Sequence, residues 1–200
     1  TILGIFLAVA VALMRISGSK LMSLPAYYFV YLIRGTPLLL QLYFVYYGLS
    51  QFEFIRESIL WPLLKEPYWC GIITLTISTG AYSSEIIRGG ILSVSKNYIE
   101  ASDALGLSQV KTFMLVTLPI TVRQALPAYG NELILMVKAS SLISIVTLME
   151  ITGIARTIIS KTYAPVEIFL VAGSIYLAIN FIIVMFVSLA ERRLGLEKAT

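Results

Sequence analysis

The sequence predicts an all-α integral membrane protein, because it is rich in apolar residues, poor in charge and divided into long apolar runs. Of its 200 residues, 58% are hydrophobic and 13% are charged, whereas average globular chains carry about 25% charged residues. This composition excludes a disordered chain, a disulfide scaffold and a nucleic-acid binder, which need few apolar residues, many cysteines and clustered surface charge respectively. The net charge of +4 is then expected on loops that face the cytoplasm and anionic lipid.

Five apolar segments are separated by charged and turn-forming residues. A membrane-spanning helix needs about 20 mostly apolar residues, and apolar runs occur at 1–14, 24–49, 68–87, 128–148 and 168–189. The first is short and apolar from residue 1, so we expect the chain to begin inside its first hydrophobic segment. The second contains Arg34 and also Pro37, which frees backbone carbonyls and indicates either a bent helix that lines a path or a plain hinge. We expect one transmembrane domain over residues 1–200.

The distribution of Lys and Arg predicts which way these segments run, because both residues are retained on the cytoplasmic side of a membrane. Nine of them follow the first, third and fifth segments: Arg15, Lys20, Arg88, Lys96, Lys111, Arg123, Arg192, Arg193 and Lys198. Four follow the second and fourth segments: Arg56, Lys65, Arg156 and Lys161. This excess predicts an N-terminus outside the cell and a C-terminus in the cytoplasm.

The long connection between the third and fourth segments is too polar in its first half to span a membrane. Long ordered connections are usually functional. Within 98–108, Ala and Leu favour a helix, Gly106 ends it, and Ser108 is placed to cap a second helix that runs to about Leu118. Residues 89–123 are therefore predicted to form two short cytoplasmic helices, joined at a glycine into a compact knob. The alternative is that Gly106 only caps a helix in an inert loop.

At these residues the chain resembles the membrane-spanning permease subunits of ABC importers. Their signature is Glu-Ala-Ala, three residues, Gly, nine residues and Ile-x-Leu-Pro, and this chain has EAS at 100–102, Gly106 and VTLP at 116–119. Three further motifs resemble the polar amino-acid uptake branch of that family: RGTPL at 34–38 with Gln41 and YYGL at 46–49, EIIRGGI at 85–91, and KASSL at 138–142 with Glu150. The resemblance covers about residues 24–193.

The resemblance implies a type I ABC importer permease fold, with five transmembrane helices and a coupling segment between the third and fourth. It also implies several partners: a cytosolic ATPase dimer, a second permease chain, either identical or paralogous, an extracytoplasmic substrate-binding protein and an amino-acid substrate, within the lipid of a bacterial cytoplasmic membrane. No phosphate loop of the form GxxxxGK[ST] occurs in the sequence, so ATP and Mg²⁺ are expected on the ATPase. The residues implied to contact the ATPase are Glu100, Ala101, Ser102, Asp103, Ala104, Leu105, Gly106 and Leu107, of which Glu100 and Asp103 can also be read as solvated charges.

Polar residues at membrane depth need a partner or an aqueous cavity, because an unpaired charge there is costly. Thr74, Ser78, Glu85 and Arg88 share one face of a helix, which belongs against other helices or a water-filled path, and Glu85 can alternatively pair with Arg88. Asn131 lies on the face of Lys138, with Ser141 one turn beyond. The predicted substrate path comprises Ser78, Glu85, Arg88, Asn131, Lys138, Ser141 and Glu150.

Glu150 indicates the substrate class. It lies at the external end of the fourth segment with no cation within four residues, so it is placed to receive a cation, and the sequence favours basic amino acids such as arginine or histidine. The alternative is that Glu150 caps a short helix beginning at Ile151 and never meets substrate.

Three other functions are compatible with parts of the sequence. The first is an ABC permease for methionine or a compatible solute, which shares the same cytoplasmic signature. The second is an ion-coupled secondary transporter that uses Glu85, Glu132 and Glu150, although such proteins commonly contain internal repeats and none is found here. The third is an intramembrane enzyme, which the absence of His and the single Cys70 disfavour.

Overall fold

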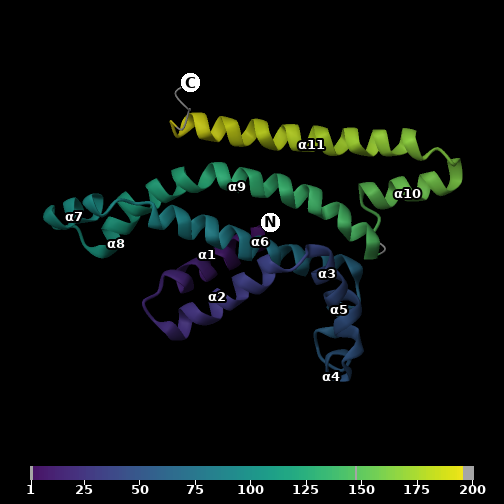
Figure 1. Cartoon of the computed structure of the whole chain (residues 1–200), viewed down its shortest axis with the longest axis horizontal. Helices are drawn as coiled ribbons and strands as arrows, with labels where there is room; N and C mark the ends of the chain where they lie inside the picture. Colours follow the sequence, from purple (N-terminus) through teal and green to yellow (C-terminus); the bar gives the residue numbers. More distant parts are fainter. Residues whose placement is uncertain (1, 147, 196–200) are drawn as a thin grey trace.

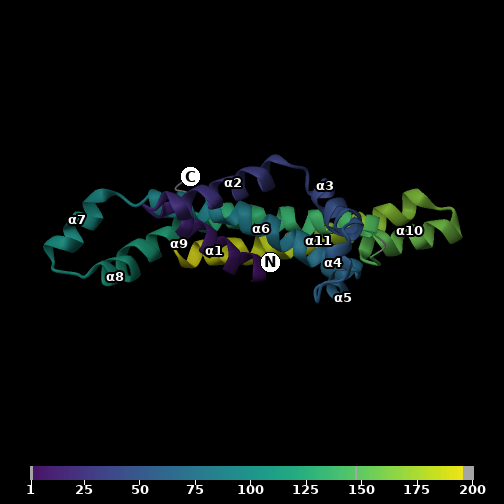
Figure 2. The same ribbon diagram turned by 90° about the horizontal axis from the view of Figure 1, so that it is seen from below.

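The computed structural model describes residues 2–146 and 148–195, and within these ranges every regular element is a helix. Thr1, where the first predicted segment begins, and Lys198, one of the counted cations, lie outside the described residues. Long helices run side by side, with two short helices projecting at one end and one helix lying at the other (Figures 1 and 2). The prediction of an all-α chain is confirmed.

The N-terminal third folds as a hairpin of α1 (Ile2–Ile16) and α2 (Lys20–Gly35). A buried cluster of Val11, Ala26 and Val30 holds the two helices together. Helix α1 also packs closely on α6 (Pro67–Leu92), where a Cβ added to Gly80 would lie only 2.5 Å from Cδ2 of Leu7. Small residues therefore let these two helices approach each other at a distance that larger side chains would prevent.

The second predicted segment, 24–49, is not one helix. After α2 the chain turns by 105° between Gly35 and Leu38, because Pro37 lacks an N–H and holds the preceding residue, Thr36, in an extended conformation (φ −115°, ψ 143°). It continues through α3 (Leu38–Tyr43), the π-helix Phe44–Gly48 and the 3₁₀ turn Leu49–Gln51. The chain therefore bends sharply at Pro37, as the proline indicated.

Residues 38–51, after the bend, form one side of a lateral arm. Its return side contains α4 (Glu53–Arg56) and α5 (Trp61–Leu64), and it leads into α6. Figure 1 shows this arm extending across the direction of the long helices.

The fourth segment was predicted over 128–148, but its helix begins much earlier. Helix α8 (Gln109–Thr112), the π-helix Phe113–Thr117 and α9 (Leu118–Ser140) form one continuous helix that ends in the 3₁₀ turn Ser141–Val146. The predicted end near Leu118 is therefore wrong. The wide π-turn lies directly before Pro119 and makes room for its ring, so the helix passes this proline without ending.

The remaining helices are α7 (Lys96–Ala104), α10 (Ile151–Thr162) and α11 (Pro165–Arg193). Helix α11 lies along α9 (Figure 1), and the contact is close at Gly130, where a Cβ would lie 2.5 Å from Cγ1 of Val187. The third and fifth predicted segments, 68–87 and 168–189, lie within α6 and α11.

Within the described ranges, two helices are long and apolar enough to cross a membrane, Gln109–Val146 and Pro165–Arg193, and the bent pair of α2 and 38–51 makes a third if it is counted as one span. Helix α1 is apolar but has 15 residues, and α6 has 26 residues rich in Ser, Thr and Gly. The predicted total of five transmembrane helices therefore stays a prediction.

Candidate functional site

The knob predicted at 89–123 is built from α7, a tight turn and α8. Ser95 caps α7 by accepting a hydrogen bond from the Asn97 N–H, and Ser108 caps α8 by accepting one from the Lys111 N–H at 3.5 Å. Between them Gly106 has φ +72°, and its N–H donates to the Asp103 carbonyl at 2.9 Å. A Cβ on Gly106 would meet nothing within 4 Å, so glycine is favoured here by the left-handed backbone rather than by lack of space. The predicted helix end at Gly106 and cap at Ser108 are confirmed.

The knob exposes apolar side chains away from the long helices. Leu105 is 80% exposed at its tip, and Tyr98 and Val110 are also exposed. Of the predicted coupling residues, Glu100, Ala101, Asp103, Ala104, Leu105 and Gly106 are exposed and Leu107 is half-buried. Ser102 is buried, and its hydroxyl donates to the Tyr98 carbonyl at 2.7 Å. Exposed apolar residues on a projecting knob are typical of a protein contact.

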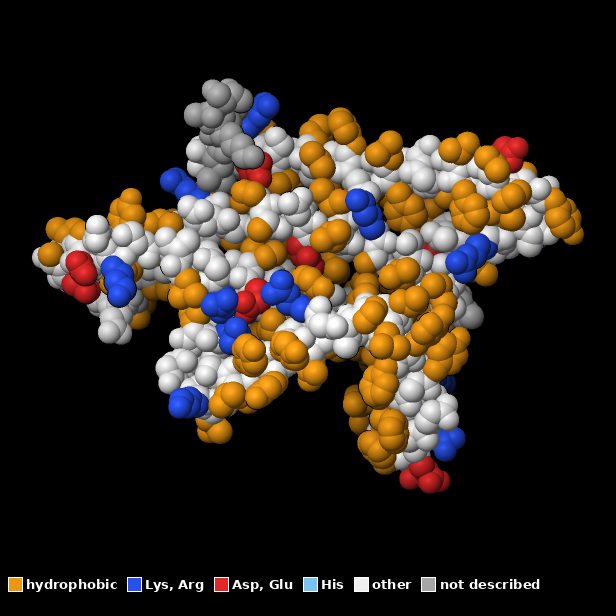
Figure 3. Space-filling view, in the orientation of Figure 1, with side chains coloured by type: hydrophobic (Ala, Val, Ile, Leu, Met, Phe, Trp, Pro, Cys, Tyr) orange, Lys and Arg blue, Asp and Glu red, His pale blue; other side chains and the backbone are white. Residues whose placement is uncertain are grey.

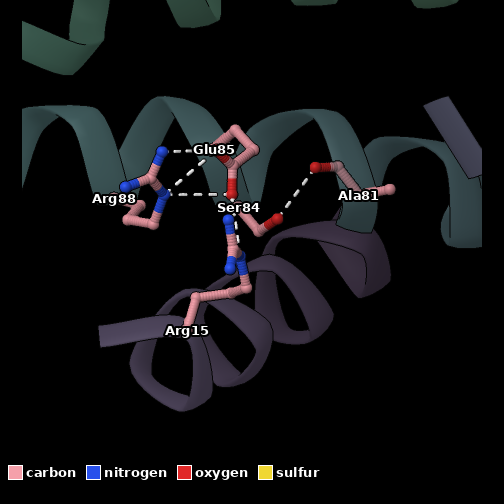
Figure 4. A network of polar contacts seen from close by, with 5 residues as sticks. All are labelled: Arg15, Ala81, Ser84, Glu85 and Arg88. Atoms are coloured by element: carbon pink, nitrogen blue, oxygen red, sulfur yellow. Dashed lines mark hydrogen bonds and ion pairs between the residues drawn. The ribbon is translucent and has the colours of Figure 1, made fainter. Parts of the chain in front are cut away.

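Glu85 lies at the centre of a charged network (Figure 4). Nη2 of Arg88 donates to Oε2 of Glu85 at 2.7 Å, and Nε of Arg88 is 3.0 Å from both oxygens, so the pair is nearly bidentate. Nε of Arg15, at the end of α1, donates to Oε1 at 3.2 Å. The predicted pairing of Glu85 with Arg88 is confirmed. Arg15 was missed as a member, because its partner is 70 residues away and no local spacing connects them.

Two arginines in this region also lie over tyrosine rings. The guanidinium carbon of Arg15 is 4.9 Å from the ring centre of Tyr27, and that of Arg34 is 5.1 Å from the ring centre of Tyr82. Arginine is attracted to the electron-rich face of an aromatic ring at such distances. Figure 3 shows acidic and basic side chains gathered where α1, α2 and α6 meet.

The predicted path residues do not converge on one cavity. Ser78 is buried among the helices. Its side of the helix therefore packs against other helices rather than lining a water-filled path. Asn131 and Lys138 are both exposed on α9, and the Ser141 hydroxyl donates to the Lys138 carbonyl at 2.6 Å. Lys138 lines a groove of about 590 Å³ between α9 and α11. Asn180 lines the same groove, and its Oδ1 is buried with no hydrogen-bond partner among the described residues. No local sequence pattern points to Asn180.

Both carboxylate oxygens of Glu150 are engaged. Oε1 accepts from the Gly153 N–H at 2.9 Å, which caps α10, and Oε2 accepts from the Tyr176 hydroxyl at 2.5 Å. The predicted capping role is therefore confirmed. The carboxylate has lone pairs left, so capping and a contact with a cation do not exclude each other.

Glu132, considered for an ion-coupled transporter, is buried, with 4% of its surface exposed. Its Oε1 has no hydrogen-bond partner among the described residues, and its carboxyl interacts electrostatically with Arg34 without an ion-pair contact. A buried carboxyl with an open acceptor is unusual, so Glu132 is a candidate functional residue.

Apolar helices of membrane-spanning length, with charged residues within them and an exposed helix–glycine–helix knob at one end, define the class as an integral membrane protein. The chain belongs to the family described as binding-protein-dependent transport system inner membrane component, which matches residues 1–196.

Relatives within this family include permeases of amino-acid transport systems. The octopine transport system permease protein OccM of Rhizobium meliloti is 51% identical over 195 residues, which cover 98% of this chain and 80% of OccM. The nopaline transport system permease protein NocM of Agrobacterium fabrum is 50% identical, with 95% and 79% covered. The histidine/lysine/arginine/ornithine transport system permease protein HisM of Salmonella typhimurium is 38% identical, with 96% and 82% covered.

Two solved structures have the same fold. A crystal structure of an amino acid ABC transporter with histidines superposes with a TM-score of 0.85 at 34% identity, covering 96% of this chain and 86% of that chain. An inward-facing conformation of the MetNI methionine ABC transporter gives a TM-score of 0.70 at 15% identity over the same shares of each chain. The chain therefore has the fold of ABC importer permeases.

Proposed function

We propose that this protein is the permease subunit of a bacterial ABC importer and forms the membrane path for polar, basic amino acids. The observation that carries this proposal is the kinship with permeases whose names specify octopine, nopaline and histidine/lysine/arginine/ornithine transport. Glu150 supplies a carboxylate with lone pairs still available, which suits a cationic substrate. ATP is hydrolysed by a separate subunit, and this chain is not the catalytic one.

The knob of α7 and α8 is proposed to dock on a cytosolic ATPase. Its exposed Leu105, Tyr98 and Val110 give the ATPase an apolar surface to bury, and the turn at Gly106 holds the two short helices at a fixed angle. The knob is joined directly to α6 and, through the π-turn, to α9, so movement of the ATPase would reach both long helices.

The full importer is proposed to contain two permease chains, identical or paralogous, two ATPase chains and an extracytoplasmic substrate-binding protein. Five spans are proposed per chain, formed by α1, the bent segment from α2 to Gln51, α6, the Gln109–Val146 helix and α11. The nine Lys and Arg residues of the larger group are proposed to lie on the cytoplasmic side, Lys198 among them although it is outside the described residues. This orientation puts the N-terminus outside the cell.

The path is proposed to pass the exposed face of α9, where Asn131 and Lys138 lie, and then the half-buried Ser141 just beyond α9, with Glu150 at its outer end. Lys138 in its groove is suited to the carboxylate of an amino acid, and Glu150 to a positive group. Glu85 and Arg88 lie at the opposite end, where their mutual pairing limits direct contact with substrate.

Uptake by proteoliposomes that contain the permease, its ATPase and its binding protein tests this proposal. We expect ATP-dependent accumulation of labelled arginine, reduced by excess lysine, histidine or ornithine and unaffected by methionine. Liposomes with an ATPase that cannot hydrolyse ATP are the matched control. Uptake driven by an ion gradient without ATP would support the secondary transporter instead, and a preference for methionine would overturn the substrate class.

A further inference from the structure

The junction of α1, α2 and α6 contains a second polar cavity, for which neither the fold nor the proposed substrate path accounts. It has a volume of about 370 Å³, and its walls include Arg15, Arg34, Tyr27, Tyr82 and Glu85. We propose that this cavity binds the phosphate of an anionic lipid headgroup at the membrane boundary on the side of the knob.

The charge around the cavity is positive. Arg15 and Arg34 line it, and Arg88 adjoins it through Glu85, whose carboxylate pairs with Arg15 and Arg88. Glu132 also interacts with Arg34 but lies beyond ion-pair distance, so even with both carboxylates counted the arginines exceed them. An anion entering this cavity meets more positive than negative charge and is therefore attracted to it.

Donors that suit a phosphate are left open in the cavity. Among the described residues Arg34 makes no hydrogen bond or ion pair, and its guanidinium is held over the ring of Tyr82. Arg15 donates to Glu85 through Nε, and its terminal nitrogens make no hydrogen bond to any described residue. A guanidinium fixed by a ring and a carboxylate presents its remaining N–H groups as a fork, and this geometry matches phosphate oxygens.

With α6 as one of the proposed spans, the cavity lies at the depth of the lipid headgroups. Helix α6 has 26 residues, so it is about 39 Å long, whereas the hydrocarbon core is about 30 Å thick. Tyr68 and Trp69 pack edge to face at its first turn, as aromatic residues do at a membrane boundary. Measured from Pro67, Glu85 lies about 27 Å and Arg88 about 32 Å along the helix, so the pair spans the opposite boundary.

The tyrosines of the cavity complete the site. Tyr27 and Tyr31 from α2 are exposed beside it, and amphipathic rings are favoured at the level of the headgroups. A basic cavity between membrane helices at this level is the arrangement that binds anionic headgroups. The ligand is therefore a phosphate diester, and a free phosphate ion shares the chemistry but lacks the acyl chains that would hold it at this depth.

Native mass spectrometry of the full chain, purified with phosphatidylglycerol and phosphatidylcholine, tests the proposal. We expect the wild type to retain phosphatidylglycerol in preference to phosphatidylcholine. Arg34→Gln should weaken phosphatidylglycerol binding about fivefold, since one cation near the surface contributes about 1 kcal/mol. Arg123→Gln is the matched control, because Arg123 is exposed on the same side but lies outside the cavity, and it should leave binding unchanged.

Two further variants keep the test decisive if Arg34→Gln fails to fold. Arg34→Lys preserves the charge without the fork and should bind phosphatidylglycerol more weakly than the wild type, whereas Tyr82→Phe preserves the ring and should bind as the wild type does. Equal loss of lipid in Arg34→Gln and Arg123→Gln would overturn the site. Displacement of the lipid by millimolar inorganic phosphate would assign it to a free anion, and displacement by arginine would assign it to the substrate path, and either result overturns the lipid proposal.

Discussion

Gln41 explains how the chain tolerates a broken helix at membrane depth. Pro37 ends α2 and leaves carbonyls without helical partners, and the Gln41 amide nitrogen donates to the Ile33 carbonyl at 2.7 Å and to the Thr36 carbonyl at 3.0 Å. The Thr36 hydroxyl donates to the Leu32 carbonyl at 2.8 Å. Side chains from both sides of the bend thus satisfy backbone groups that lipid cannot.

Replacing Gln41 should therefore destabilise the bend. We expect Gln41→Leu to reduce stability by about 1–3 kcal/mol, because it leaves carbonyls unpaired. Thermal unfolding in detergent, followed by circular dichroism, measures this. Gln51→Leu is the matched control, since the Gln51 amide makes one exposed bond of 3.3 Å to the Tyr47 carbonyl and its loss should matter little. Equal melting temperatures for the two variants would contradict the role of Gln41.

Substitution of Glu150 tests whether this residue contacts the substrate. Glu150→Gln keeps an oxygen that can accept from the Gly153 N–H, so α10 should stay capped, while the negative charge is lost. We expect uptake of basic amino acids to fall and basal ATP hydrolysis to stay unchanged in reconstituted importer. Tyr176→Phe removes the hydroxyl on Oε2 without removing the charge and serves as the control. Equal loss for every substrate, or no loss, would remove the reason to prefer basic substrates.

At the scale of elements, hydropathy located the long helices but not their ends or breaks. Pro37 indicated the bend, but hydropathy did not mark the 105° turn, because apolar residues continue on both sides of it. Helix α9 begins ten residues before the predicted segment because Arg123 and Gln124 interrupt the apolar run without interrupting the helix. Apolar patterning records contact with lipid, whereas helix ends depend on caps and prolines.

The knob was predicted more completely, because its structure is set by local residues. Ser95, Gly106 and Ser108 each act within three or four residues of their own position. The network of Arg15 and Glu85, in contrast, joins two helices 70 residues apart, and only the packing of α1 on α6 reveals it. Local motifs could be predicted from the sequence, and long-range pairings could not.

The docking role of the knob is tested at Gly106. Gly106→Leu forces a residue with a Cβ into φ +72°, which costs about 1–2 kcal/mol, so the turn should change shape while the long helices stay folded. We expect weaker association with the ATPase, measured by co-purification and by substrate-stimulated hydrolysis. Gly106→Asn should retain most of the association, because Asn tolerates this conformation. If Gly106→Leu co-purifies as the wild type does, with full stimulated hydrolysis, coupling does not depend on this turn.

At the scale of the whole molecule, the fold separates its two ends. The α1–α2 turn, the knob and the end of α11 lie at one end, and α10 and the lateral arm lie towards the other (Figure 1). The described residues of the larger Lys and Arg group belong to the first end, and Arg56, Lys65, Arg156 and Lys161 belong to the arm and α10. A charge asymmetry counted along the sequence therefore becomes a difference between two ends in space, as the positive-inside rule requires.

Cysteine accessibility measures which end faces the cytoplasm. Cys70 is fully buried, and Cys70→Ser removes it as a background. In this variant Lys96→Cys places a thiol on the exposed start of α7, and Ser58→Cys places one in the arm between α4 and α5. Because the basic end is proposed to be cytoplasmic, Lys96→Cys should react with a membrane-impermeant maleimide in inverted vesicles, and Ser58→Cys in intact cells stripped of their outer membrane. Detergent-solubilised protein is the control, in which both should react. The reverse pattern would place the knob outside, where no cytosolic ATPase can reach it, and would overturn the orientation and the docking proposal together.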